Sequence, residues 1–115
     1  MRSIRKSKKT TGRLAFPSES IVALIDLVAL SDDVTVRYAP DLARREKTIE
    51  AVARIEGTKR PKTITLTTIK GWDAGAISAA RLLFDQAKRL LAAAVQAKQS
   101  GALDSFRARF DAIIT

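Results

Sequence analysis

Basic side chains give this chain its clearest chemical potential. It has 21 lysines and arginines against 12 acidic residues, which gives a net charge of +9 at pH 7 and a pI near 10.5. The first sixteen residues hold six of these cations and no acid, namely Arg2, Arg5, Lys6, Lys8, Lys9 and Arg13. A run of like charges stays solvated and attracts polyanions, of which nucleic acid is the commonest. We therefore expect residues 1–16 to form a flexible, disordered basic tail that contacts phosphates.

A second group of cations lies in the middle third of the chain. Nine basic and four acidic residues occur between Val34 and Gly71. The positions expected to contact nucleic acid here are Arg37, Arg44, Arg45, Lys47, Arg54, Lys59, Arg60 and Lys62. Arginine and threonine side chains donate hydrogen bonds to phosphate oxygens, and arginine does so in a bidentate way. Basic turns are also typical of ordinary solvent-facing loops, but two basic regions in one small chain favour phosphate binding.

Residues suited to catalysis or metal binding are sparse. The chain has no cysteine and no histidine, which excludes disulfides, thiolate-bound zinc and the usual general base near neutral pH. Asp32 and Asp33 are adjacent, and adjacent side chains point apart in a strand. Asp41, Glu46 and Glu50 are interspersed with basic residues, which favours ion pairs over a metal site. We therefore expect a protein that is not an enzyme and has no cofactor or metal.

Three stretches in the middle of the chain alternate between apolar and polar residues, as strands do. They are Val34–Ala39, Thr48–Ile55 and Lys62–Thr68, separated by turn signals that contain proline or glycine. Strands joined in this way form a three-stranded antiparallel meander. A competing interpretation makes Asp41–Glu56 one helix, because alanine, arginine, glutamate and lysine abound there. In the meander, an open face is expected to present Thr35, Arg37, Thr48, Arg54, Thr65 and Thr67.

Helical spacing of apolar residues flanks the predicted strands. It begins after Pro17 and ends near Leu30, and it resumes from Asp73, a fair N-cap, through a long helix. A shorter final helix begins near Leu103. We expect a single α+β domain over residues 17–115, with a helix, the meander, a long helix and a short C-terminal helix packed on one sheet face. The wide apolar stripe of the last two helices also offers a surface for homo- or hetero-oligomerisation.

The aromatic residues are expected to serve the core. Tyr38 shares a strand face with Val34 and Val36, and the phenylalanines of the last two helices lie on apolar stripes. Trp72 stands at a strand-to-helix junction, where it either stacks on a base or, as we expect, seals the edge of the core. Base stacking is therefore not predicted, and contact with the phosphate backbone is.

The order helix, three antiparallel strands, helix, with basic loops, is similar to that of the Alu-domain proteins of the signal recognition particle. The parallel covers about Ser18 to Gln96 and rests on Val34–Tyr38, Thr48–Ile55, Lys62–Ile69 and the helix from Asp73. Those proteins pair as a heterodimer and grip RNA with sheet faces and basic loops. The likeness lies in element order and charge, without a diagnostic motif, and the basic tail and final helix depart from it.

The sequence therefore predicts a non-enzymatic nucleic-acid-binding protein, with DNA and RNA undecided, that serves as a subunit of a ribonucleoprotein or other nucleoprotein assembly. The alternative is a protein–protein interaction or assembly module, of phage, host-defence or adaptor type, that binds an acidic protein surface. The longest apolar run, Ile21–Leu30, includes Asp26 and is half of the roughly 20 residues that a membrane span needs. We expect a cytoplasmic, nucleoid- or particle-associated protein, with organelle import left open by the basic N-terminus.

Overall fold

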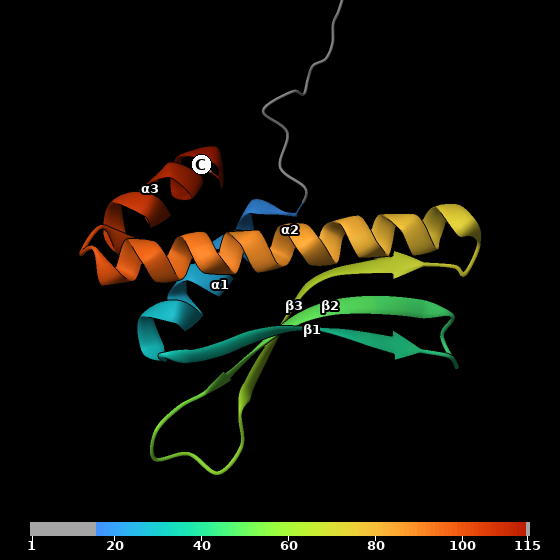
Figure 1. Cartoon of the computed structure of the whole chain (residues 1–115), viewed down its shortest axis with the longest axis horizontal. Helices are drawn as coiled ribbons and strands as arrows, with labels where there is room; N and C mark the ends of the chain where they lie inside the picture. The colour runs from blue at the N-terminus through green and yellow to red at the C-terminus, as the bar shows by residue number, and fades with distance from the viewer. Residues whose placement is uncertain (1–15, 115) are drawn as a thin grey trace, which may run out of the picture.

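The computed structural model describes the chain from residue 16 to residue 114, with side chains as far as residue 110. Within that range the elements are α1 (Ser18–Leu30), β1 (Asp33–Asp41), β2 (Glu46–Arg54), β3 (Lys62–Lys70), α2 (Ala74–Gln99) and α3 (Leu103–Ile114) (Figure 1). This order confirms the predicted α+β fold. The competing helix over residues 41–56 is wrong, because β2 occupies most of that range. The six cations predicted in residues 1–16 lie outside the described residues.

The three strands form an antiparallel sheet in the order β1-β2-β3, so β2 is hydrogen-bonded on both of its edges. Helices α1 and α2 contact all three strands, and α3 packs against α1 and α2. In Figure 1 the helices form a layer above the sheet, and the connection between β2 and β3 projects away from that layer. The other face of the sheet has no helix of the described chain over it. None of the helices in residues 16–114 is long and apolar enough to cross a membrane.

The core lies between the buried face of the sheet and the helical layer. Helix α1 contributes large aliphatic side chains such as Leu24 and Ile25, and β2 contributes Ile49, all fully buried. From α2 the buried residues are alanines spaced seven apart, namely Ala80, Ala87 and Ala94. Because an alanine side chain is only a methyl group, this stripe lets α2 approach the sheet closely. The larger side chains of α1 fill the remaining space.

The third strand departs from the predicted alternation. A bulge interrupts the register between Ile49 and Glu50 of β2, whose partners on β3 are Thr67 and Thr65. Directly opposed residues share a face of the sheet, so Thr67 lies on the buried side with Ile49. The prediction that Thr67 belongs to the open face is therefore wrong, and Thr68 is exposed in its place. The extra residue in β3 reverses the alternation beyond the bulge.

Burial makes a direct prediction for two leucines. Leu24 is 0% exposed at the centre of the core, whereas Leu42, in the turn after β1, is 78% exposed. We expect Leu24→Ala to lower the free energy of unfolding by about 2–5 kcal/mol, since it removes packed methyl groups and leaves a cavity. Leu42→Ala should change it by less than about 0.5 kcal/mol. Urea denaturation followed by circular dichroism measures both, and equal losses would contradict this core.

Candidate nucleic-acid interface

Lys47 is the most deeply buried of the predicted contact residues that the structure describes. Its side chain is fully buried, its Nζ donates to the carbonyl oxygen of Gly71, and it lies 4.3 Å from the centroid of the Trp72 ring. Because β2 begins at Glu46, Lys47 falls in the strand and shares the buried face of Ile49. The expectation that Lys47 contacts nucleic acid is corrected accordingly, and its charge instead stabilises the position of Trp72 by a cation–π contact.

Two further predicted contact residues are held by carboxylates. Arg37 Nε lies 2.7 Å from an oxygen of Glu50, its direct partner across β1 and β2. Arg44 Nε lies 3.9 Å from the carboxylate of Asp41, which also accepts the backbone N–H of Arg44 at 3.1 Å. An arginine already paired with a carboxylate must give up that pair to bind a phosphate. The open face of the sheet is therefore electrostatically closer to neutral at its centre than the sequence indicates.

Four of the five remaining predicted contact residues lie at the end of the sheet where β2 turns into β3, and the fifth, Arg45, lies at the other end. We call Arg54, Lys59, Arg60 and Lys62 the hairpin cluster. All four side chains are exposed, and none forms an ion pair with any residue that the structure describes. Their connection projects from the body of the protein in Figure 1. These four cations are therefore available to an external anion.

Hydrogen bonds within the loop hold it in one shape. The backbone N–H of Thr58 donates to the carbonyl oxygen of Ile55 at 3.1 Å, and the Thr58 hydroxyl reaches the same oxygen at 2.6 Å. Gly57 has a φ of +86° at the third position of this turn, where a side chain would be strained. The loop encloses a hollow of about 330 Å³. Three members of the hairpin cluster line it, together with the acidic residues Asp33 and Glu56.

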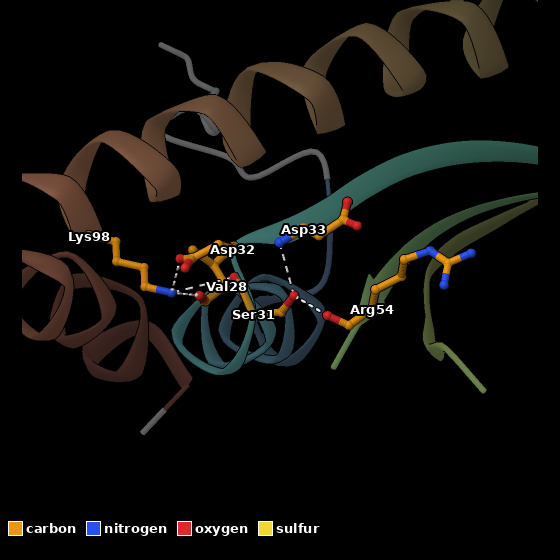
Figure 2. A network of polar contacts seen from close by, with 6 residues as sticks. All are labelled: Val28, Ser31, Asp32, Asp33, Arg54 and Lys98. Atoms are coloured by element: carbon orange, nitrogen blue, oxygen red, sulfur yellow. Dashed lines mark hydrogen bonds and ion pairs between the residues drawn. The ribbon is translucent and has the colours of Figure 1, made fainter. Parts of the chain in front are cut away.

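A polar network anchors the base of this hairpin to the helices (Figure 2). The Ser31 hydroxyl donates to the carbonyl oxygen of Arg54 at 2.5 Å and accepts the backbone N–H of Asp33 at 2.9 Å. Lys98 of α2 donates to the carbonyl oxygen of Val28 at 2.7 Å and to a carboxylate oxygen of Asp32 at 2.8 Å. A cation at the C-terminal end of a helix satisfies carbonyl groups that have no partner within the helix. Lys98 thus fixes the end of α1, from which β1 departs.

The Lys98 contact also changes the acidity of Asp32. The hydrogen bond from Lys98, reinforced by its positive charge, holds the pKa of the Asp32 carboxyl below its usual value. Because this pKa is lower in the folded than in the unfolded chain, the pair stabilises the fold above the ordinary aspartate pKa of about 3.9. That stabilisation is lost as the pH falls through the folded-state pKa.

We expect Lys98→Met to return the pKa of Asp32 to its ordinary value and to flatten the pH dependence of stability below about pH 4. Loss of the charge at the end of α1 should also cost about 1 kcal/mol at neutral pH. A carboxyl NMR titration and urea denaturation at several pH values measure the two effects. Lys88→Met is the control, since its pair with Asp85 is exposed on both sides and contributes little. An unchanged Asp32 pKa in Lys98→Met would contradict the network.

The opposite end of the sheet carries a different set of groups. Arg45 has a φ of +58°, and its carbonyl oxygen accepts the backbone N–H of Gly71 at 2.9 Å, which brings the residues before α2 to the β1–β2 turn. The Arg45 side chain is exposed and makes no ion pair with a described residue. Tyr38 is 40% exposed, so the prediction that it belongs to the core is wrong. Trp72 is half-buried, with Lys47 Nζ beneath its ring, and lies at this end of the sheet.

The surface expected to support oligomerisation is largely turned inward. Leu103, Phe106 and Phe110 of α3 pack against the core, and the rings of Phe106 and Phe110 meet edge to face with centroids 5.3 Å apart. Arg107 further ties α3 to α1, since its Nε lies 2.7 Å from a carboxylate oxygen of Asp26. In the described residues, this apolar stripe serves intramolecular packing.

The exposed cations of the hairpin cluster are groups that attract anions. Among the residues that the structure describes, no three acidic, cysteine or histidine side chains gather as a metal site. Comparisons of the chain with protein-family models, with curated proteins and with solved structures found no match. The likeness in element order to the Alu-domain proteins of the signal recognition particle therefore contributes nothing further, and the assignment of function rests on the residues of the site.

Proposed function

We propose that this protein binds nucleic acid through the phosphate backbone, largely independently of sequence, and that it is not an enzyme. The hairpin cluster is the main contact with phosphates within the described residues, and the six cations of residues 1–16 supply a second contact. The single observation that supports this most is the set of four exposed cations without ion pairs at one end of the sheet, two on the projecting loop and two at the strand ends that flank it. These cations outnumber the two acidic residues beside them, and a chain of phosphates relieves the repulsion among like charges.

The shape of the loop supports a polyanion more than a single small anion. The lining of the hollow beneath the loop includes two acidic residues, Asp33 and Glu56, whose negative charge disfavours an anion placed inside it. The cations nevertheless outnumber these acids, and all four cationic residues are exposed to solvent. A ligand with many charges spaced along a backbone can contact them from outside without entering the hollow. Such a contact carries no sequence information, because only phosphates are touched.

The proposal predicts a strong salt dependence. If about six phosphates are engaged in total, the logarithm of the affinity should fall against the logarithm of salt concentration with a slope of roughly −4 to −5. Lys59→Gln/Arg60→Gln should weaken binding roughly tenfold and reduce the magnitude of that slope by about 1.5, through the loss of two phosphate contacts. Fluorescence anisotropy with labelled single-stranded and duplex oligonucleotides over a salt series measures both quantities.

The matched control is Arg89→Gln/Arg109→Gln, which removes the same charge from exposed positions on α2 and α3, in the helical layer. It should leave the affinity close to that of the unmodified chain. If both double variants lose affinity equally, net charge alone governs binding and the hairpin is not the site. If the unmodified chain binds no nucleic acid at low salt, the proposed function is wrong. Pull-down partners that survive nuclease digestion would then favour the alternative, an assembly module for an acidic protein surface.

A further inference from the structure

An apolar groove of about 430 Å³ lies at the end of the sheet opposite the hairpin cluster. It is lined by Tyr38 of β1, by Trp72, and by Ile77, Ala80, Arg81 and Phe84 of α2. Helices α1 and α3 lie beside the C-terminal half of α2, so among the described elements its first turns neighbour the sheet alone (Figure 1). Two apolar side chains of the groove are consequently left about two-fifths exposed, Tyr38 at 40% and Ile77 at 41%.

The charges around this groove select an anion. Arg81 is the one charged residue in the lining, it is exposed, and it forms no ion pair within the described part of the chain. Lysines also flank two of the aromatic walls. Lys47 Nζ lies 4.3 Å from the Trp72 centroid, and Lys88 Nζ lies 4.8 Å from the Phe84 centroid. Positive charge beside the rings and no carboxylate in the lining disfavour a cationic occupant.

The groove therefore suits a flat apolar group that carries a negative charge beside it. We propose that it holds one unpaired nucleobase stacked against Trp72 or Tyr38, with the adjoining phosphate on Arg81; this inference rests on the proposed nucleic-acid binding. Its volume falls in the range of small-ligand pockets, about 300–1,000 Å³, and accommodates a base with its sugar. A paired base cannot leave its stack without cost. The groove thus gives the protein a preference for single strands that the hairpin cluster alone does not provide.

The test uses the intrinsic fluorescence of Trp72, which is the only tryptophan in the chain. The full-length protein is titrated with a twelve-nucleotide oligothymidylate, with the duplex of the same length, and with inorganic polyphosphate. Twelve nucleotides extend about 40 Å even at the duplex spacing of ~3.4 Å. We expect saturable quenching by the single strand, because a base stacks on the indole, and little quenching by the duplex or by polyphosphate.

Two substitutions at exposed positions separate stacking from folding effects. Tyr38→Leu should weaken single-strand binding roughly 5- to 150-fold, the range that corresponds to the loss of one stacked base, and leave duplex binding unchanged. Arg81→Gln should lower the salt slope for the single strand by about 1. The controls are Leu82→Ala, next to Arg81 but outside the groove, and Arg89→Gln, which matches the loss of charge. Neither should alter the quenching.

The outcomes distinguish base stacking in the groove from the phosphate binding on which it rests. Suppose that the single strand binds without quenching Trp72 and that Tyr38→Leu binds it as tightly as the unmodified chain does. These two results would overturn the proposal that the groove holds a base, and they would leave phosphate binding intact. Equal quenching by polyphosphate would also overturn it, because that ligand has no base to stack. Failure of every nucleic acid to bind at low salt would overturn both proposals. A dimer in sedimentation that Tyr38→Leu dissociates would assign the groove to a second copy of the chain instead.

Discussion

The central strand β2 fixes the two faces of the whole sheet, because it is hydrogen-bonded to a neighbour on each edge. Its inward residues, among them Ile49, Ala51 and Ala53, are fully buried, and its outward residues alternate with them. This alternation also places Lys47 on the inward face, where its side chain is fully buried and its Nζ lies beneath the Trp72 ring. It places Glu50 outside, where it neutralises Arg37. One strand therefore determines which cations remain available and where the tryptophan is held.

The two ends of β2 are secured by different interactions. At the Arg54 end, the Ser31 hydroxyl accepts from the start of β1 and donates to the end of β2, while Lys98 fixes α1 just before this point. At the Lys47 end, the carbonyl oxygens of Arg45 and Gly71 connect the β1–β2 turn to the residues that lead into α2. Both anchors are backbone carbonyls bonded by groups distant in sequence. The side chains next to them are consequently free to face solvent from fixed positions.

The fold follows from the sequence because periodicity and turn chemistry are local properties. Whether an individual cation is buried, paired or exposed does not follow from the sequence, because it depends on contacts between distant residues. Arg37 and Glu50 meet only once the register of β1 on β2 is set. The prediction that Lys47 contacts a ligand is wrong because the strand begins at Glu46 and includes it. Residues two apart in a strand share a face, so its spacing from buried Ile49 is the signal that indicates burial. The exposure of Tyr38 depends on how far α1 and α3 reach along α2, and no local pattern records that reach.

The separation of the hairpin cluster from the aromatic groove constrains what a ligand gains from both. Strands of nine residues place the two ends of the sheet about 25–30 Å apart. A ligand shorter than this contacts one end and gains only the energy of that contact. A longer flexible strand that binds at one end holds its remainder near the other, so the second contact forms at a high effective concentration. A stiff duplex can lie across the cations but presents no free base at the groove. For the proposed nucleic-acid ligand, length and strandedness, rather than base sequence, are therefore the properties that this geometry would distinguish.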